Sequence, residues 1–277
     1  MFSREQLERY SRQFVLKEIG VSGQKRLLAA KVLVIGAGAL GSPALLYLAA
    51  AGVGCLGIAD FDTVDVSNLQ RQIIHDHSRL GMYKALSAAE TIRELNADVH
   101  TEPFAEMVTP DNISALISDY DFIVDATDSI EAKLLINDAC VLGKRPFVHA
   151  GAARFDGQVM TYIPGQGPCL RCLLGPEPPH QGGNQCALYG VLGAATGILG
   201  SIEAAEAIKY LLGIGQTLCG RVLFLRGLEM RISCAELARD PSCPLCGSRP
   251  SIHDLNERAD DYHFDRCETE AGDGHGQ

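Results

Sequence analysis

The sequence lacks an excess of positive charge. It contains 24 lysine and arginine residues against 34 aspartate and glutamate residues, which gives a formal net charge of -10 at pH 7. Proteins that bind nucleic acids over a broad surface concentrate positive charge to neutralise phosphates. We therefore expect no such surface in this chain, and any basic site has to be local.

The sequence also shows no pattern typical of export or of a membrane span. Its first residues, "MFSREQLERYSRQ", are polar and helical in character, so we expect no signal peptide, no membrane anchor and a cytoplasmic location. Residues 32–59 carry no charged side chain, but six glycines and Pro43 interrupt them. These interruptions favour a buried strand, turn, helix and strand over a membrane-spanning helix.

Disulfide bonds are not expected, although cysteine is frequent. The chain has ten cysteines in 277 residues. In a protein without an export signal, cysteines are more often free thiols, metal ligands or nucleophiles than a disulfide framework. A chain of this length can bury one large core, so folding should not depend on cross-links.

Residues 31–62 contain a glycine-rich turn between two apolar segments. The turn has the GxGxxG pattern at Gly36, Gly38 and Gly41, an apolar helix follows it, and Asp60 ends the second apolar segment. This order is typical of a βαβ unit that binds a nucleotide. The glycines permit a tight turn and let backbone N–H groups approach phosphates at the helix N-terminus. A glycine turn that serves only close packing is the alternative.

Strand and helix patterns continue to alternate after this unit. They predict an α/β fold with a Rossmann-like, mostly parallel sheet and helices on both faces. Open parallel sheets bind ligands at the carboxyl ends of their strands, where Gly36, Asp60 and Asp128 all fall. The expected helices are 83–95 and 131–143, and the expected strands are 121–129 and 145–151.

The side chains expected at this edge suit a polyphosphate better than a nicotinamide. Asp60 can accept hydrogen bonds from ribose hydroxyls, and Asp128 stands where a hard oxygen ligand could hold Mg²⁺ against phosphates. Arg71 and Lys84 add positive charge. Each residue also has a structural alternative, since an aspartate at a strand end often caps a helix and a single arginine or lysine is usually solvated. In combination they favour ATP over NAD.

Two CxxC pairs predict a metal site. The pairs are "CLRC" at 169–172 and "CPLC" at 243–246. Four thiolates satisfy Zn²⁺ with no open position for water, so we expect a closed, structural zinc site with Cys169, Cys172, Cys243 and Cys246 as ligands. The competing interpretation is a redox dithiol, which is typical of one pair next to a βαβ start rather than of two remote pairs.

Cys186 is a candidate nucleophile. It follows the proline- and glycine-rich segment "GPEPPHQGGNQ", which we expect to be a mobile loop, and it precedes a long helix. A helix N-terminus stabilises a thiolate. The alternative is that Cys186 is one more small buried side chain.

Several motifs occur together: "RYSRQ" at 9–13, residues 36–54, "DFDTVDVSNLQRQ" at 60–72, "DATDS" at 125–129, the two CxxC pairs and residues 190–213. Together they resemble the ThiF/MoeB/HesA family, the bacterial relatives of ubiquitin-activating enzymes. The resemblance covers residues 5–248, with the motifs in the family's order and spacing. It implies an adenylyltransferase that binds Mg-ATP and the C-terminal Gly-Gly of a ubiquitin-like sulfur carrier. The carrier's carboxylate would attack the α-phosphate and release pyrophosphate.

The resemblance also implies a role for single residues. Asp60 would bind the ribose, and Asp62 would lie beside the nucleotide. Asn68, Arg71 and Lys84 would contact the phosphates. Four of these residues lie in the stretch from residue 58 to residue 72, and Lys84 follows twelve residues later.

Three further roles follow from the same resemblance. Asp128 would coordinate Mg²⁺, and Arg12 would reach the ATP site of a partner subunit, so the active unit would be a homodimer. Cys186 matches the family's loop cysteine. Two departures accompany it: Ala194 and Ala195 stand where the family often has a proline, and "ALY" replaces a more usual acid-containing tripeptide.

We expect four regions along the chain. Residues 1–30 form an N-terminal helical segment, and residues 31–165 form the Rossmann-like ATP-binding region. Residues 166–250 form the zinc-binding and carrier-binding region of the same domain. Residues 251–277 are rich in acids and read as a flexible acidic tail.

The pathway and two other functions stay open at this point. Thiamine and molybdopterin biosynthesis both use such enzymes, and the "CPLCG" ending favours the thiamine type, with sulfur delivered by a separate protein. One alternative is an NAD-dependent oxidoreductase with a structural zinc. The other is a non-catalytic binder of a ubiquitin-like partner, against which the set Arg71, Lys84 and Asp128 argues.

Overall fold

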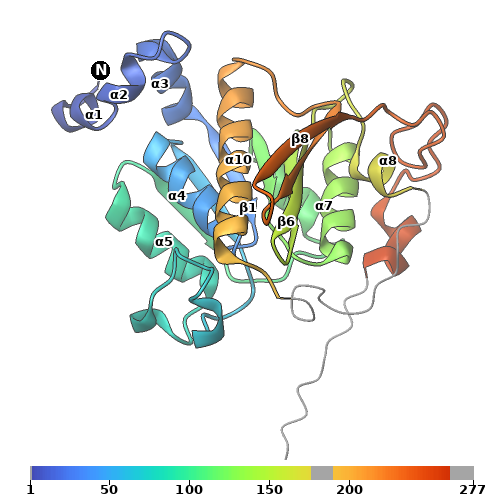
Figure 1. Ribbon diagram of the computed structural model, residues 1–277, viewed down its shortest axis with the longest axis horizontal. Helices are drawn as coiled ribbons and strands as arrows, with labels where there is room; N and C mark the ends of the chain where they lie inside the picture. The colour runs from blue at the N-terminus through green and yellow to red at the C-terminus, as the bar shows by residue number, and fades with distance from the viewer. Residues whose placement is uncertain (1, 176–189, 263–277) are drawn as a thin grey trace, which may run out of the picture.

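The computed structural model describes residues 2–175 and 190–262 (Figure 1). Nearly all strands and helices of these ranges belong to one sheet and the layers that cover it. The helices and strands are α1 (Arg4–Arg9), α2 (Ser11–Phe14), α3 (Gly20–Ala29), β1 (Lys31–Ile35), α4 (Gly41–Ala51), β2 (Cys55–Ala59), η1 (Val66–Asn68), η2 (His77–Arg79), α5 (Lys84–Leu95), β3 (His100–Phe104), α6 (Ile113–Ser118), β4 (Phe122–Asp125), α7 (Ile130–Leu142), β5 (Phe147–Ala153), β6 (Asp156–Tyr162), α8 (Leu170–Leu174), α10 (Gly193–Leu212), β7 (Arg221–Arg226), β8 (Arg231–Glu236) and η3 (Leu255–Tyr262).

The sheet has eight strands in the order β3-β2-β1-β4-β5-β6-β7-β8. The first five strands are parallel, and the last three continue the sheet in antiparallel pairs. The predicted α/β fold with a mostly parallel sheet is confirmed. The antiparallel strands were not expected, and they arise because β5 and β6 join through the short turn at Arg154 and Phe155 rather than through a helix.

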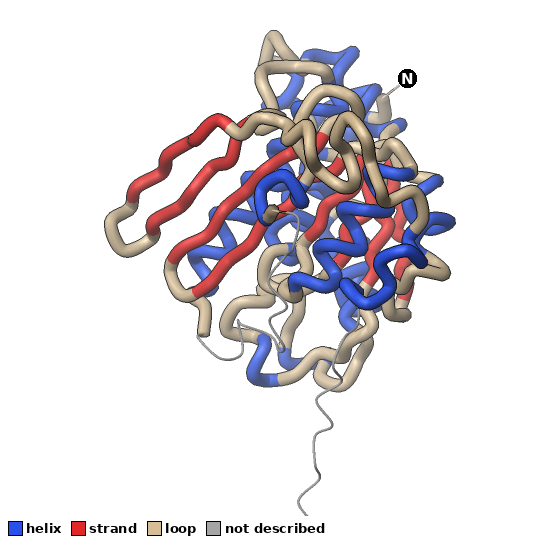
Figure 2. Tube along the Cα trace, turned by 90° about the vertical axis from the view of Figure 1, so that its right-hand side faces the viewer, coloured by secondary structure: helices blue, strands red, loops and turns tan. Residues whose placement is uncertain are grey.

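Helices cover both faces of the sheet (Figure 2). Side chains of β1 alternate between two cores: Val32 and Val34 pack with α4, α5 and α10, while Leu33 and Ile35 pack with α6 and α7. This explains why β1 reads as a continuous apolar run, since a strand buried on both faces needs no polar alternation.

The N-terminal helices dock at the end of the molecule where α4, α5 and α10 finish (Figure 1). Tyr10 is buried, and its hydroxyl accepts a hydrogen bond of 3.0 Å from Asn96, just after α5. Gln13 donates to the carbonyl of Ala51 at the end of α4, and Arg26 donates to the carbonyl of Leu212 at the end of α10. Because parallel strands and these helices run in opposite directions, this end lies away from the carboxyl ends of the parallel strands.

The C-terminal part is packed as far as Tyr262. Ile252, Leu255 and Tyr262 are buried against the core that includes α7. The expected start of the acidic tail at residue 251 is therefore wrong, because apolar side chains up to residue 262 find a place in that core. Residues 263–277 lie outside the described residues. Within 2–175 and 190–262, no helix is long and apolar enough to cross a bilayer.

Candidate functional site

The glycine-rich turn joins β1 to α4 and leaves no room for side chains at two positions. Gly36 has φ of +98°, and a Cβ there would stand 2.7 Å from the carbonyl oxygen of Ala126. A Cβ on Gly41 would stand 1.9 Å from the carbonyl oxygen of Gly36. At Gly38 the nearest atom to such a Cβ is 3.7 Å away. Glycine is therefore required at Gly36 and Gly41. The turn lies directly before the N-terminus of α4, the position at which backbone N–H groups bind phosphate.

Asp60 is tied to this turn. Its Oδ2 accepts a hydrogen bond of 2.8 Å from the N–H of Ala37, and its Oδ1 accepts one of 2.9 Å from the N–H of Asp62. Burial raises the pKa of Asp60, while the nearby Lys84 amine and both hydrogen bonds lower it. A carboxylate has about four acceptor positions, so each oxygen retains capacity for a ligand hydroxyl.

His75 binds the other backbone polar group of the same residue, Ala37, and no sequence pattern indicated this role. Its Nε2 lies 2.9 Å from the carbonyl oxygen of Ala37, and its Nδ1 lies 2.8 Å from the Ser87 hydroxyl. A carbonyl only accepts, so Nε2–H donates to Ala37 and Nδ1 accepts from Ser87. Burial lowers the pKa of His75 to about 4, so the ring is neutral at pH 7 and has this tautomer.

Lys84 and Asp62 form an ion pair in the loop region after β2. The Lys84 amine lies 2.9 Å from Asp62 Oδ2, and the Lys84 N–H donates to the Asp62 carbonyl. Lys84 is buried, whereas Asp62 is exposed. The start of α5 is thereby fixed beside Asp60, so the predicted ribose and phosphate residues are neighbours.

Asn68 and Arg71 belong to the turn around η1. The Asn68 side chain accepts a hydrogen bond of 3.3 Å from the N–H of Asp65, and Arg71 Nη1 donates to the carbonyl of Ser67 at 2.9 Å. A Cβ on Gly193 would stand 3.2 Å from the Cα of Arg71, so the first turn of α10 packs on this backbone. The half-buried residue Arg71 therefore packs its backbone against the start of α10, while its guanidinium bonds to the carbonyl of Ser67.

The predicted Mg²⁺ ligand lies on the loop that follows β4. Asp128 is exposed, three residues after the buried Asp125 that ends the strand. This loop contacts the glycine turn, because the carbonyl of Ala126 is the atom nearest to the missing Cβ of Gly36. The structure thus brings the turn, Asp60 and the loop of Asp128 to one edge of the sheet.

Arg12 is not part of this edge. It is an exposed residue of α2, in the segment that docks where α4, α5 and α10 end. The glycine turn and Arg71 lie at the beginnings of α4 and α10, and α10 is ~30 Å long from its 20 residues. In this structure the predicted residue Arg12 is therefore far from the nucleotide edge of its own chain. Cys186 lies outside the described residues.

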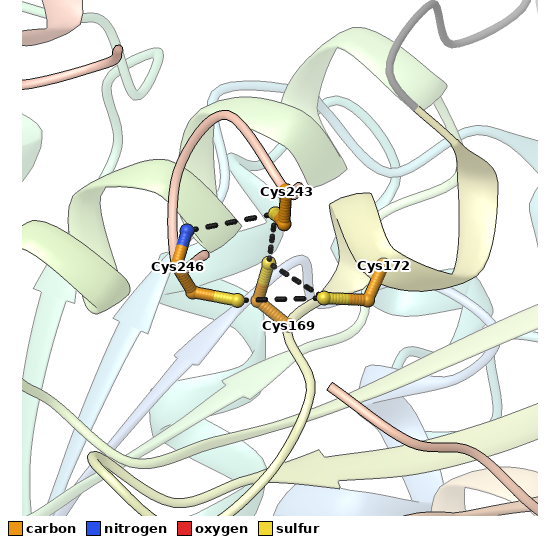
Figure 3. A group of neighbouring side chains, drawn as sticks. All are labelled: Cys169, Cys172, Cys243 and Cys246. Carbon is orange, nitrogen blue, oxygen red and sulfur yellow. Dashed lines mark hydrogen bonds between the residues drawn. The ribbon is translucent and has the colours of Figure 1, made fainter. Parts of the chain in front are cut away.

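The four predicted zinc ligands form one cluster (Figure 3). Their sulfurs lie within 4.8 Å of one another, with Sγ separations of 4.0, 3.7 and 3.4 Å for the 169–172, 169–243 and 172–246 pairs. A tetrahedral ion with Zn–S bonds of about 2.3 Å needs S–S separations of about 3.8 Å. The cluster therefore fits a closed zinc site with four cysteine ligands, which joins α8 to the segment after β8.

A buried arginine reinforces this connection, and sequence patterns gave no indication of it. Arg171, between the first two cysteines, places Nε 2.8 Å from Asp138 Oδ1 on α7 and Nη2 2.8 Å from Asp261 Oδ2 in η3. Tyr262 donates a hydrogen bond of 2.6 Å to the same Asp138 carboxylate. The C-terminal segment is thus fastened to α7 and α8 by a charge network next to the sulfur cluster.

Curated proteins resemble this chain over most of its length. The chain is 46% identical over 256 residues to adenylyltransferase and sulfurtransferase MOCS3 of Bos taurus, covering 92% of this chain and 56% of that protein. The chain therefore spans about half the length of that relative. It is 44% identical to SAMP-activating enzyme E1 of Haloferax volcanii, covering 91% of this chain and 93% of that protein.

Solved structures show the same fold at lower identity. The E. coli MccB structure with MccA-N7isoASN superposes with a TM-score of 0.77 at 21% identity, covering 89% of this chain and 75% of that chain. The family model for the ThiF family matches residues 10–245, which include the glycine turn, the candidate nucleotide residues and three of the four clustered cysteines. The chain belongs to the ThiF family.

Proposed function

We propose that this chain is an ATP-dependent adenylyltransferase that activates the C-terminal glycine of a ubiquitin-like sulfur carrier. The observation that carries the proposal is the convergence of a phosphate-binding turn, a fixed acceptor carboxylate, two cations and an exposed carboxylate at one sheet edge. Support comes from the two relatives at 44–46% identity, one named as an adenylyltransferase and the other as an activating E1 enzyme.

The residues of this edge divide the work of binding the nucleotide. The turn at 36–41 faces the phosphates with backbone N–H groups, and Asp60 accepts from the ribose. Asn68, Arg71 and Lys84 contact the phosphates. Charge-assisted contacts of this kind contribute about 1.5–3 kcal/mol each.

The reaction needs positioning and charge neutralisation rather than a strong base. A C-terminal carboxylate is already ionised at pH 7, so no proton has to be removed from it. One of its oxygens attacks the α-phosphorus, and the bond to the β-phosphate oxygen breaks as pyrophosphate leaves. Two anions must approach each other, and Arg71 and Lys84 lower that barrier by offsetting charge.

A divalent cation fits the same edge. Asp128 provides an exposed hard oxygen ligand on the loop that touches the glycine turn, which is the type of ligand that Mg²⁺ takes together with substrate phosphates. Mg²⁺ supplies further neutralisation of phosphate charge when it is bound. Asp128 would hold it.

The same set of residues argues against the two other functions. A nicotinamide oxidoreductase needs no buried lysine and exposed carboxylate around the glycine turn. A protein that only held a ubiquitin-like partner would need no charge-neutralising groups at a nucleotide site. Zn²⁺ in the four-cysteine cluster would be structural in either case, because four thiolates leave no open position.

Three further parts of the proposal concern assembly and pathway. Arg12 would complete the nucleotide site of a second copy of this chain, so the active unit would be a homodimer. Cys186 would act as a nucleophile after adenylation, and a separate protein would donate the sulfur. The thiamine-type carrier stays the favoured partner, with the molybdopterin-type carrier as the other choice.

Exchange of radiolabelled pyrophosphate into ATP, measured with purified candidate carriers, tests the function. We expect exchange that depends on one carrier, and no binding of NAD. Asp128→Ala should lower the rate about 100-fold or more while the protein stays folded. Without this ligand for Mg²⁺, the repulsion between the triphosphate and the attacking carboxylate is no longer offset at the transition state. An exchange rate like the wild type in a folded Asp128→Ala variant would sink the assignment of Asp128, and a wild type inactive with every carrier would sink the function.

A further inference from the structure

A buried carboxylate that the proposed chemistry does not use lies directly behind the loop of Asp128. Asp125 ends β4 with no exposed surface. It accepts hydrogen bonds from the Thr127 hydroxyl at 2.6 Å, from the Thr127 N–H at 3.2 Å and from His149 Nδ1 at 3.1 Å. The Lys133 amine lies 3.4 Å from the same carboxylate. Four groups of three residues thus converge on one side chain.

Asp125 is ionised although it is buried. Burial alone raises its pKa, but the Lys133 amine and the His149 hydrogen bond outweigh it and lower the pKa to about 2. Burial lowers the pKa of His149, so its ring is neutral and donates through Nδ1–H. Lys133 also donates to the carbonyl of Ala150 at 2.7 Å. The cluster therefore contains one ion pair and no uncompensated charge.

Such an ion pair is a weak source of stability. Removing both charges from water costs several kcal/mol per ion, and apolar side chains of similar size are often equally stable in such places. The pair therefore calls for a reason other than stability. The contacts of Asp125 indicate such a reason, because it accepts two hydrogen bonds from Thr127, the residue that precedes Asp128.

The loop of Asp128 is held on both sides. On one side, Ala126 donates its N–H to the carbonyl of Ile35 at 2.9 Å, and Thr127 is bound to Asp125. On the other side, the Ser129 hydroxyl accepts from the N–H of Ala132 at 3.2 Å and caps α7. Asp128 is the residue between these two anchors. Its backbone conformation is therefore set by groups that are themselves fixed.

We propose that Asp125 is a positioning residue for Asp128. Through the Thr127 hydroxyl and N–H it fixes the loop 126–129 in one conformation, so that the Asp128 carboxylate is already oriented when Mg-ATP arrives. Lys133 and His149 keep the Asp125 carboxylate ionised and correctly rotated. The inference rests on the proposed function, in that Asp128 meets the metal of Mg-ATP. A preorganised ligand binds more tightly because no ordering cost remains at the time of binding.

The test uses a matched pair of variants at Thr127. Thr127→Val has nearly the same shape but lacks the hydroxyl that donates to Asp125, whereas Thr127→Ser keeps it. The readout is the affinity for ATP, by titration calorimetry, with Mg²⁺ and without it. We expect Thr127→Val to weaken Mg-ATP binding about tenfold, which is about 1.4 kcal/mol, and to leave metal-free ATP binding unchanged, since the lost hydrogen bond orients only the ligand of the metal. Thr127→Ser should bind Mg-ATP within about twofold of the wild type.

A double variant separates positioning from a general loss of structure. If Thr127 acts only through Asp128, then Thr127→Val should have no further effect on Mg-ATP affinity in an Asp128→Ala background. Thr101→Val on β3 makes the same side-chain exchange away from the site and serves as the folding control. Additive losses in the double variant, or a folded Thr127→Val protein with wild-type Mg-ATP affinity, would overturn the inference. Asp125→Asn should reproduce the loss of Mg-ATP affinity; thermal unfolding checks that it is folded.

The binding readout keeps this inference distinct from the proposed function. Failure of every carrier to support pyrophosphate exchange would remove the proposed reaction but would leave the Mg-ATP titrations interpretable. Wild-type protein that binds ATP equally with and without Mg²⁺ would overturn the positioning role even if exchange were observed.

Discussion

The amine of Lys84 lies 2.9 Å from the carboxylate of Asp62, so two residues predicted to meet the nucleotide form an ion pair with each other. Lys84 is only 6% exposed, and its charge is therefore poorly solvated. Asp62 is on the exposed side of the pair. The pair holds the Lys84 amine beside Asp62 at the first residue of α5.

This relationship predicts unequal effects of two substitutions. Lys84→Ala should lower kcat/KM for pyrophosphate exchange about 10- to 100-fold, because a charge-assisted phosphate contact of about 1.5–3 kcal/mol is lost. Asp62→Asn should lower it less than Lys84→Ala, since an amide oxygen can still accept from the amine. Steady-state exchange kinetics measure both, with Arg249→Ala as the control for an exposed cation elsewhere. A larger loss in Asp62→Asn than in Lys84→Ala would contradict this order.

The sulfur cluster predicts one zinc ion per chain. Cys243→Ser, or a strong chelator, should release the metal and loosen the segment 240–262, because the site joins it to α8 and structural zinc contributes about 10–16 kcal/mol in small peptides. Elemental analysis and hydrogen exchange measure the two effects. Cys234→Ser changes an exposed cysteine of β8 and should keep the zinc. Purified protein that contains iron, or no metal at all, would argue against the site.

The position of Arg12 predicts complementation between subunits. Three of its neighbours in "RYSRQ" are anchored within the chain: Arg9 donates to the carbonyl of Leu95, Tyr10 accepts from Asn96, and Gln13 donates to the carbonyl of Ala51. Arg12 is exposed at the end of the molecule away from its own nucleotide edge. Arg12→Ala and Asp128→Ala proteins should each be inactive alone, and mixing them should restore part of the exchange activity, because one site in each mixed dimer is then complete.

The mixing experiment needs proof that subunits exchange. Native mass spectrometry of differently tagged chains provides it. Arg4→Ala, also an exposed arginine of the N-terminal helices, should be active by itself. Verified mixed dimers without any recovered activity would show that Arg12 does not serve the partner's site.

Glu203 on α10 predicts a pH-dependent stability. Its carboxyl is fully buried, and within the part of the chain that the structure describes no hydrogen bond of good geometry reaches either oxygen, although the Ala150 backbone amide lies close by. Burial raises the pKa of Glu203 well above its usual value, although the nearby Lys133 amine opposes this. The folded protein therefore holds a proton that the unfolded chain releases above about pH 4.3.

A carboxyl group whose pKa is raised on folding contributes least to the free energy of unfolding at high pH. As pH rises above about 4.3, the unfolded chain gains by ionising while the folded protein keeps its proton until the higher folded pKa is passed, so the free energy of unfolding falls over that range. Glu203→Gln removes this dependence with little change of shape. Its unfolding temperature should exceed that of the wild type, and the difference should be larger at pH 8 than at pH 5. Thermal unfolding at both pH values checks this, and a difference that shrinks with rising pH would be evidence for an ionised Glu203.

The sequence by itself determined the features that depend on local spacing. The GxGxxG turn, Asp60 at the end of β2 and the alternation of strands and helices follow from the chain's periodicity, which reports burial and backbone geometry within about 30 residues. The cysteine cluster was predictable across 70 residues because two CxxC pairs need one shared ion. These patterns repeat a residue type at fixed intervals, and that is what makes them visible without a structure.

Only the tertiary structure decided the contacts between single polar residues that are remote in sequence. His75 reaches Ala37 across 38 positions, Lys133 and His149 meet at Asp125, and Arg171 joins Asp138 to Asp261. No local pattern marks such partners, because a hydrogen bond depends on where two elements come to lie and not on the spacing along either one. The antiparallel strands β6–β8 and the placement of Arg12 were not visible in the sequence for the same reason. The direction of the strands depends on the connections between them, and the place of Arg12 depends on where the N-terminal helices dock on the assembled sheet.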